Sequence, residues 1–519
     1  MLLGSALTPT HLRLLLAPTL VGLVVAALVI HVFPRARGSG VNQTKAALYI
    51  YNGFVPFRTA VGKFITAALA IGAGHSLGPE DPSLQIGAGI ASGLGRWLRL
   101  SREKVRLIAP VGAAAGLAAA FNAPISAVLF VIEEVIGRWS ASILGSVVLA
   151  SISSVVVARW FLGEEPLFRI PAVELARPEE LLAYAVLGVI GGIAAVIFAK
   201  AIGKLRPMAK ALPRWTQYFQ PAIAGLLIGL IGYFGAPQVM GAGYQFMDQA
   251  IHNQYTWQML AMLAGLKILS TTLSFVSGTP GGMFAPTLFI GAMLGGAVGG
   301  VESRLFPHLT GSLGTYALVG MGVLFAGFLR APMTSVFMVL EVTGSYSIIV
   351  PVILANTIAY LLSRSLQPVP LFDMLTIQDG TPLPSMEELR EEPILRVEDA
   401  MRTSGFSVFE AEDLLSDAVQ RMNGAAEDAL IRHRSGWSWV NKEEIHHLIS
   451  EGKGETPIGS AFPHRRIVHL YPDQPLEVAL RYAGESPILP VVHRAQTRQL
   501  EGTISLSDIL NAYRRLDSQ

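Results

Sequence analysis

Two adjacent carboxyl groups lie in a largely apolar part of the chain. Glu80 and Asp81 occur in "LGPEDPSLQIGAGI", where small and apolar residues dominate. Pro82 suits the first position of a helix and Asp81 suits its cap, so we expect a helix to begin here. The first turn of such a helix leaves amides unpaired at the positive end of its dipole, which favours an anion. We expect a similar helix to begin at Pro286 in "GGMFAPTLF".

A carboxylate at such a helix end is an anion tethered to the protein. Glu80 can therefore occupy the place of a free anion and leave it when protonated, which would couple one proton to anion movement. Carboxylates within a membrane are costly, so a functional role is the first interpretation. The alternative is that Glu80 and Asp81 only cap the helix.

The elements that must position these acids are membrane helices. Of 519 residues, 51% are hydrophobic and 15% charged, and the mean hydropathy is +0.48. Apolar runs repeat from about residue 12 to residue 366, which predicts an all-α polytopic membrane domain. The first run is expected to remain as a helix, because no small-residue cleavage site follows it.

Charge and cysteine content argue against several classes of protein. The formal net charge is +2 with scattered basic residues, which is not the pattern of a nucleic-acid-binding protein. The absence of cysteine excludes disulfides and thiolate metal sites. An intramembrane enzyme using His75, Glu133 and Glu134 is a further hypothesis, but no metal-ligand spacing or nucleophile–base arrangement supports it.

The membrane domain contains an internal repeat. Segments match in order at offsets of 203, 204 and 208 residues, which predicts a binding site near the midplane between two copies. The alternative is a chance likeness between Gly- and Pro-rich helices. The helix at 181–202 has no partner in the first copy, so we expect that the chain begins upstream of Met1 or has lost that helix. The matched residues include Pro18 with Pro221, Gly22 with Gly225, Gly38 with Gly241, Lys63 with Lys267, Pro82 with Pro286 and Pro124 with Pro332.

The two copies carry different numbers of acidic residues at matching positions. Glu133 matches Glu341, whereas a valine stands opposite Glu134, so Glu134 is the extra ionisable group of the first copy. It either has a functional role or is a solvated or salt-bridged acid at a helix end. Lys63 and Lys267 lie in apolar stretches, where they either offset buried negative charge or extend to the membrane interface.

Three motifs make the chain resemble the CLC family of chloride channels and proton-coupled anion exchangers. They are "GSG" at 38–40, "GPEDP" at 78–82 and "GMFAP" at 282–286, in the order and at the spacing of that family. The resemblance runs from about residue 17 to residue 373. It implies a CLC-type inverted repeat with re-entrant helices, the first copy at about 12–160 and the second at about 181–366.

The resemblance also implies roles for single residues. Ser39 would bind the central anion through its hydroxyl, and the amides of Met283 and Phe284 would complete the site. Glu80 would be the external gating glutamate, and Glu134 would relay protons from the cytoplasm, as in the exchangers. The alternative for Ser39 is a small residue that permits close helix packing.

The chain departs from the family pattern at several positions. Pro79 replaces a basic residue, and Asp81 replaces a glycine, adding a negative charge that can cap amides and compete with the ion. Asn42 replaces a proline. Phe372 stands at the inner side of the anion site, where a tyrosine hydroxyl often binds. The serine of "GSG" favours chloride over nitrate, and the motif argues against the fluoride-exporting branch.

The function implied by the resemblance is chloride/proton exchange across the bacterial inner membrane by a homodimer with one pathway per subunit. The alternative is a passive, voltage-independent chloride channel of the same fold. The expected partners are chloride, protons and the lipid bilayer, without nucleic acid, metal or another cofactor in the membrane domain.

The charged C-terminal segment is expected to fold in water as an α/β domain. We predict a membrane domain at 1–373, a linker at 374–392 and a cytoplasmic domain at 393–519 that resembles a pair of CBS motifs. Such modules can bind adenine nucleotides, and Ser505 and Asp508 in "GTISLSD" match positions that often contact ribose. The alternative is a purely structural dimerisation module, because the first copy lacks this pattern.

Overall fold

The chain forms two compact units. The computed structural model describes residues 10–137, 141–163, 168, 179–306, 312–381, 383–391, 395–422, 427–434, 436–462 and 466–517. The first unit comprises residues 1–391 and the second residues 392–519. Part of the segment predicted as a linker is helical and belongs to the first unit.

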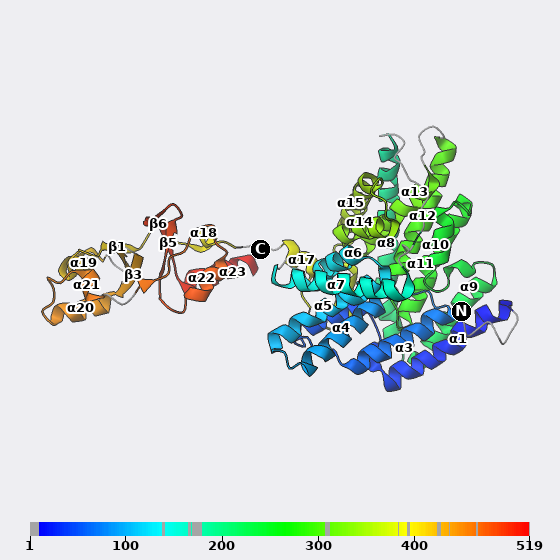
Figure 1. Ribbon diagram of the computed structural model, residues 1–519, viewed down its shortest axis with the longest axis horizontal. Coiled ribbons are helices and arrows are strands. Elements are labelled where there is room, and N and C mark those ends of the chain that lie inside the picture. Colours follow the sequence, from blue (N-terminus) through cyan, green and yellow to red (C-terminus); the bar gives the residue numbers. More distant parts are fainter. Residues whose placement is uncertain are drawn as a thin grey trace. The chain divides into compact units, whose positions relative to one another are not determined.

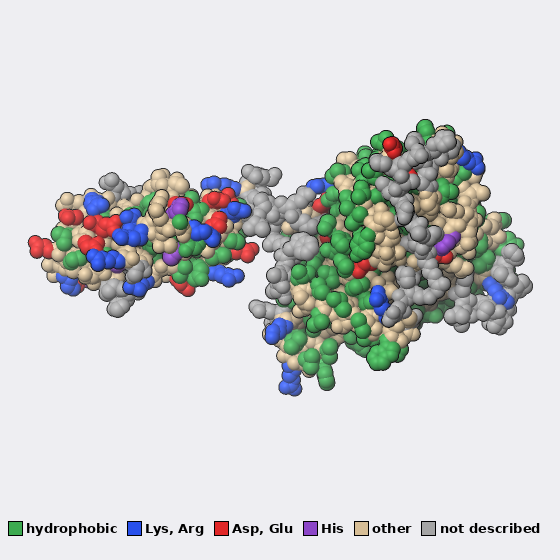
Figure 2. Space-filling view, turned by 45° about the horizontal axis from the view of Figure 1, so that its top comes forward, with side chains coloured by type: hydrophobic (Ala, Val, Ile, Leu, Met, Phe, Trp, Pro, Cys, Tyr) green, Lys and Arg blue, Asp and Glu red, His purple; other side chains and the backbone are tan. Residues whose placement is uncertain are grey.

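The first unit is mostly helical (Figure 1). Among the described residues, seven helical stretches are long and apolar enough to cross a membrane. Hydrophobic side chains cover much of the face seen in Figure 2, as a lipid-facing surface requires. These features confirm a multi-pass membrane domain. Its helices are α1 (Thr10–Ala27), η2 (Leu28–Val32), η3 (Pro34–Ala36), α2 (Gly40–Tyr49), α3 (Phe57–Ala73), α4 (Glu80–Trp97), α5 (Arg102–Phe121), α6 (Pro124–Phe130), η4 (Val131–Ile136), α7 (Ala141–Leu162), α8 (Glu180–Ala211), η5 (Arg214–Tyr218), α9 (Gln220–Tyr233), η6 (Pro237–Val239), α10 (Tyr244–Ile251), α11 (Trp257–Val276), α12 (Phe284–Leu305), α13 (Leu313–Leu329), α14 (Pro332–Thr343), α15 (Ile349–Leu366), α16 (Leu371–Gln378) and α17 (Met386–Glu391).

The two sequence copies meet through reciprocal contacts. Helix α1 packs on α9 (Figure 1). A Cβ atom added at Gly22 would lie 2.7 Å from the Pro221 carbonyl oxygen, and one at Gly225 would lie 2.3 Å from that of Pro18. Glycine lets these backbones approach closely. Gly22 matches Gly225 in the repeat and Pro18 matches Pro221, so the two contacts are equivalent. The copies are therefore related by a pseudo-two-fold axis.

Glu133 and Glu341 cap each other's helices and follow the same symmetry. The Glu133 carboxylate accepts hydrogen bonds of 3.1 and 2.9 Å from amides in the first turn of α14. The Glu341 carboxylate accepts bonds of 2.9 and 2.7 Å from amides in the first turn of α6. Each charge therefore stabilises a helix N-terminus of the other copy. This cap gives Glu133 a structural role.

Glycines also bring α4 against α5 and α12 against α13. A Cβ atom at Gly87 would lie 2.1 Å from the Gly112 carbonyl oxygen, and one at Gly291 would lie 2.2 Å from that of Gly320. The four positions match in the repeat. Close packing of this kind holds α4 and α12, the two helices expected to begin at the anion site.

The second unit contains two small sheets with helices. One sheet has the order β1-β2-β3-β4, with β1 parallel to β2 and the other pairs antiparallel, and β5 pairs antiparallel with β6. The order helix–strand–strand–helix occurs twice, in α19 to α20 and in α22 to α23. The elements are α18 (Val397–Ala400), β1 (Ser407–Glu410), α19 (Leu415–Arg421), β2 (Asp428–His433), β3 (Gly436–Asn441), α20 (Lys442–Ser450), α21 (Ile458–Ala461), β4 (Arg466–Ile467), α22 (Leu476–Tyr482), β5 (Leu489–His493), β6 (Gln496–Ile504) and α23 (Leu506–Asp517). Charges of both signs are interspersed on its visible face, which suits a domain that folds in water (Figure 2).

Candidate functional site

The loops before α4 and α12 meet inside the first unit. The Gly78 amide donates to the Gly282 carbonyl and the Gly282 amide donates to the Gly78 carbonyl, both at 2.8 Å. Helices do begin at this point, but earlier than predicted, at Glu80 and not at Pro82 for α4. Proline fits inside the first turn because amides there need no intrahelical partner. Asp81 consequently lies in the first turn and is not the cap residue.

Glu80 lies at the N-terminus of α12. Its side chain is fully buried, and its Oε2 atom lies 3.4 Å from the Ala285 amide nitrogen. The Tyr244 hydroxyl at the start of α10 donates to Oε1. A Cβ atom at Gly78 would lie 2.2 Å from Oε2, so the carboxylate lies directly against the Gly78 backbone. Lys267 adds an electrostatic interaction with Glu80.

Asp81 binds a different helix N-terminus. Its carboxylate accepts hydrogen bonds from the amides of Gly40 at 3.0 Å and Val41 at 2.8 Å, in the first turn of α2. The Ser39 hydroxyl lies 3.4 Å from Asp81 Oδ1. Adjacent carboxylates therefore contact helices of the two different copies: α2 of the first and α12 of the second.

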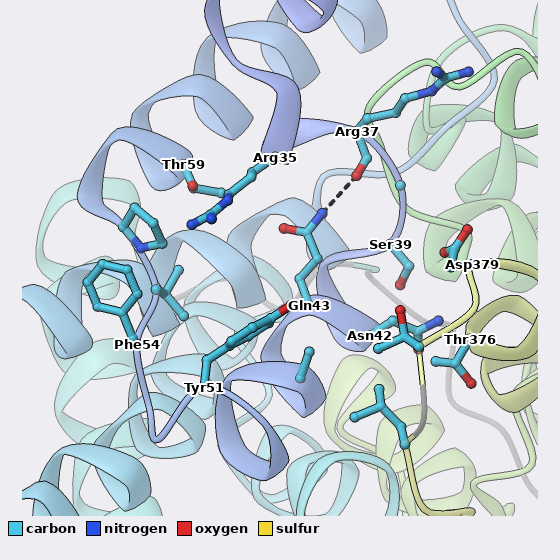
Figure 3. A pocket seen from close by; sticks show the side chains of 16 residues that line it. Arg35, Arg37, Ser39, Asn42, Gln43, Tyr51, Phe54, Thr59, Thr376 and Asp379 are labelled. Carbon is cyan, nitrogen blue, oxygen red and sulfur yellow. Dashed lines mark hydrogen bonds between the residues drawn. The ribbon is translucent and has the colours of Figure 1, made fainter.

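Ser39 precedes α2 and lines a cavity of about 260 Å³ (Figure 3). Arg35, Arg37 and Asp379 line the same cavity. The Ser39 side chain is buried, as are Met283 and Phe284 at the start of α12. The cavity thus gives a polar approach to one of the predicted anion ligands.

Phe372 on α16 is buried beside α2. Its ring lies edge-on to that of Phe130, with 6.5 Å between the ring centroids. The Phe284 ring also lies edge-on to Phe130, with 4.8 Å between the centroids. The Asn42 side chain donates to the Phe372 carbonyl at 3.0 Å. Asn42, which replaces a proline of the family pattern, therefore ties α2 to α16.

Lys63 and Lys267 are fully buried, so neither extends to an interface. Lys63 Nζ donates to the carbonyls of Ala36 and Gly38 at 3.2 and 2.6 Å. Lys267 Nζ donates to the matching carbonyls of the second copy at 2.9 and 2.7 Å. Lys63 thus holds the loop before α2, and Lys267 holds the loop before α10. Lys63 interacts electrostatically with Asp81, and Lys267 with Glu80.

Glu134 forms a buried ion pair with Lys45 of α2. The Lys45 Nζ and Glu134 Oε1 atoms are 2.5 Å apart, and the side chains are 0% and 3% exposed. Lys45 Nζ also lies 3.6 Å from Asp373 Oδ1, and Asp373 accepts a hydrogen bond of 2.6 Å from the Ser385 hydroxyl. Glu134 lies in the π-helical segment η4, and such segments are frequent at functional sites. Glu134 is therefore paired with a cation from α2 of the same copy.

Sequence reasoning missed Lys45, Asp373 and Tyr244. Tyr244 matches Val41 in the repeat, so its place at the start of a half-helix was readable from the chain. Lys45 follows the polar run "NQT" and carried no sign of burial. Its partners lie far away in sequence, so only the fold brings them together.

The predicted nucleotide contacts in the second unit are joined by a basic residue. Ser505 and Asp508 both bond to Arg402, whose Nε lies 2.9 Å from Asp508 and whose guanidinium lies 3.0 Å from the Ser505 hydroxyl. The Ser505 hydroxyl also donates to Asp508 at 2.6 Å. Arg402, Ser505 and Asp508 are therefore hydrogen-bonded to one another within the second unit.

Comparison with known proteins identifies the family of the chain. A family model described as voltage gated chloride channel matches residues 21–364. The chain belongs to this family, the CLC proteins. The motif-based resemblance, the mostly helical CLC fold and a role in chloride transport are thereby confirmed.

CLC relatives include both putative channels and exchangers. The chain is 32% identical over 355 residues to a putative chloride channel protein, ClcB-like, from Ralstonia nicotianae, covering 68% of this chain and 82% of the relative. It is 32% identical over 382 residues to the H+/Cl− exchange transporter ClcA of Vibrio campbellii, covering 72% and 81%. The structure of a slow cyanobacterial Cl−/H+ antiporter matches with a TM-score of 0.66 at 25% identity, covering 73% of this chain and 89% of that one.

The CLC relatives are named as chloride channels and exchangers, and the groups in the enzyme hypothesis have separate structural partners. Glu133 caps α14, Glu134 pairs with Lys45, and the fully buried His75 ring lies 3.1 Å from the Pro18 carbonyl oxygen. The geometry therefore favours transport over catalysis.

Proposed function

We propose that this CLC protein exchanges chloride for protons across the bacterial inner membrane, with Glu80 as the gate. One observation carries the proposal: the buried Glu80 carboxylate lies at the N-terminus of α12, where the two copies meet. An anion site at a helix N-terminus is occupied by a residue that becomes neutral when it binds a proton. The named exchanger and antiporter among its relatives support proton coupling.

The transport cycle follows from competition for the α12 N-terminus. Chloride approaches through the cavity lined by Arg35 and Arg37, whose charges raise the local anion concentration. It binds at Ser39 and at the amides that begin α12. When Glu80 takes up a proton, its attraction to α12 falls and chloride replaces it. When Glu80 loses that proton, the carboxylate returns and expels the anion.

The cavity is assigned to the cytoplasmic side. Residues 376, 379, 381 and 383 line it, and among the described residues no candidate membrane span follows Asp379. Glu134 relays protons from that side, and Lys45 is its ion-pair partner. Phe372 offers no hydroxyl there, so Ser39 supplies the side-chain donor.

The test uses purified protein in liposomes with an outward chloride gradient. Chloride release and external pH are recorded together for the wild type, Glu80→Gln and Glu134→Gln. The proposal expects proton uptake driven by chloride efflux in the wild type. It expects no proton movement in either variant, with chloride release retained in Glu134→Gln. Glu341→Gln is the matched control, because it removes a carboxylate from a helix cap and should leave coupling unchanged.

Chloride release without proton movement in the wild type would contradict exchange and favour the passive channel. The ratio of the chloride flux to the proton flux gives the coupling stoichiometry. Cross-linking in native membranes tests the proposed homodimer independently of transport.

For the second unit we propose a pair of CBS-like modules, supported by the repeated helix–strand–strand–helix order. Binding of an adenine nucleotide at Ser505 and Asp508 would have to displace Arg402. Calorimetric titration of ATP into the full chain tests this, with Asp508→Ala as the control. No heat of binding in the wild type would leave dimerisation as the role.

A further inference from the structure

Asp81 departs from the pattern of its family, and its carboxylate contacts the N-terminus of α2. Its two carboxylate oxygens bind the amides of Gly40 and Val41, and Ser39 lies beside one of them. A Cβ atom at Gly40 would lie 2.5 Å from the Asp81 carbonyl oxygen, so this contact is close and specific. The donors that face Asp81 are those a helix N-terminus offers to an anion.

The fold itself does not call for a carboxylate at this position. In the second copy, Ala285 stands at the position of Asp81 and Ala242 at that of Ser39. Helix α10, the counterpart of α2, begins after Gly243, which supplies no side-chain cap. The Asp81 and Ser39 pair is therefore a feature of the first copy alone.

The buried Asp81 carboxylate has a buried lysine as its neighbour. Its side chain is 2% exposed, and the buried Lys63 interacts with it electrostatically. Lys63 also holds the carbonyl of Gly38, next to Ser39. The negative charge of Asp81 therefore offsets a positive charge that would otherwise act on an anion at Ser39.

We propose that Asp81 is a second tethered anion, permanently docked on α2, that lowers the affinity of the transport site for chloride. It occupies the α2 amides, shares the Ser39 hydroxyl with the transported ion and cancels the field of Lys63. Chloride then relies on the α12 side, where Glu80 competes for it. Asp81 thereby sets the affinity of the site for chloride, and this role rests on the proposed anion transport.

Calorimetric titration of chloride into the purified full chain tests the role of Asp81. The variants are Asp81→Asn, which removes the charge, and Asp81→Ser, which keeps a small acceptor for the α2 amides. We expect both to bind chloride about tenfold more tightly than the wild type, because a like charge beside the ion is removed. Glu341→Gln is the matched control, since it also uncaps a helix, and its dissociation constant should equal that of the wild type.

The outcomes separate this role from a structural cap and from the proposed function. Dissociation constants within twofold of the wild type, together with lower melting temperatures, would overturn the proposal and leave Asp81 as a helix cap. Failure of both variants to fold would also overturn it. Absence of chloride binding in every folded protein would contradict the proposed function, whereas equal binding with intact proton coupling would contradict only the role of Asp81.

Discussion

At the scale of single residues, the site depends on donors that hold carboxylates in place. Glu80 is held by the Tyr244 hydroxyl and the Ala285 amide, and Glu134 by Lys45. Each contact holds in place an acid whose proposed work requires release or protonation. Removing a single donor should therefore change transport or stability in a definite direction.

Tyr244→Phe should speed transport. Loss of the hydroxyl weakens the docked state of Glu80, and a hydrogen bond to a charged group contributes roughly 1.5–3 kcal/mol. We expect chloride turnover in liposomes to rise by about tenfold. Tyr255→Phe, which removes a hydroxyl that donates to Gln249, is the control and should leave turnover unchanged. Equal rates in the wild type and Tyr244→Phe would show that release of Glu80 does not limit turnover.

Lys45→Met should destabilise the protein strongly. The variant leaves Glu134 buried without its cation, and breaking such a pair costs roughly 3–5 kcal/mol. The double variant Lys45→Met/Glu134→Gln removes both charges and should recover most of the loss. Thermal unfolding in detergent measures both. A single variant as stable as the wild type would contradict a stabilising buried ion pair between Lys45 and Glu134.

At the scale of elements, close helix contacts set the position of the half-helices. The glycines between α12 and α13 let the backbones touch, and the same contact recurs between α4 and α5. Since α4 carries Glu80 and α12 begins with the proposed anion ligands, a shift of either helix changes the site.

Gly291→Ala should lower stability and transport together. The added Cβ would lie 2.2 Å from the Gly320 carbonyl oxygen, and overpacking of this kind costs about 1–3 kcal/mol. Gly265→Ala on α11 is the matched control, because a Cβ there meets no atom within 4 Å. Alanine in a helix should stabilise the control by about 0.5–1 kcal/mol. Equal melting temperatures for both variants would contradict the close contact.

In the second unit, the pair of β2 and β3 should loosen at acidic pH. Burial and the nearby Arg466 lower the pKa of His433, whose ring bonds to the Ser438 hydroxyl at 2.7 Å. Below about pH 6.5, His433 binds a proton more readily in the unfolded chain than in the folded unit. The stability of the folded unit therefore decreases as the pH is lowered. Hydrogen exchange of β2 and β3 amides, corrected for intrinsic rates, measures this. His433→Gln should flatten the dependence, and an equal slope in both proteins would exclude His433 as its source.

At the scale of the whole molecule, the pseudo-two-fold arrangement brings the loops before α4 and α12, and with them the proposed anion site, between two halves of the membrane unit. The Gly78 and Gly282 loops pair directly, and Glu133 and Glu341 cap across the copies. An ion bound between the halves should therefore stabilise the complete unit and not just one helix.

Removal of chloride should lower the melting temperature. A ligand that binds only the folded state at a concentration of 100 times its Kd adds about 2.7 kcal/mol. Replacing chloride by gluconate at constant ionic strength removes this contribution. Glu80→Gln should show a larger shift, because the neutral side chain competes less for the α12 N-terminus. A melting temperature independent of chloride in both proteins would argue against the site.

Much of the architecture was determined by the sequence alone. The hydrophobic runs, the repeat and the three motifs predicted the membrane domain and its family, because these signals are local or recur along the chain. The short motif likewise drew attention to Glu80, which the structure buries beside the first turn of α12. The Gly- and Pro-rich breaks at 78–82 and 282–286 predicted helix starts, and α4 and α12 begin within them.

The partners of the charged groups were decided only by the tertiary structure. Asp81 was expected at the cap of its own helix but binds α2, and Glu134 pairs with Lys45 from a different element. Tyr244 reaches Glu80 across 164 residues of sequence. A side-chain hydrogen bond depends on a few ångströms between distant segments, and periodicity does not encode such distances. The helices could therefore be predicted from the chain, whereas the balance of charges at the site required the fold.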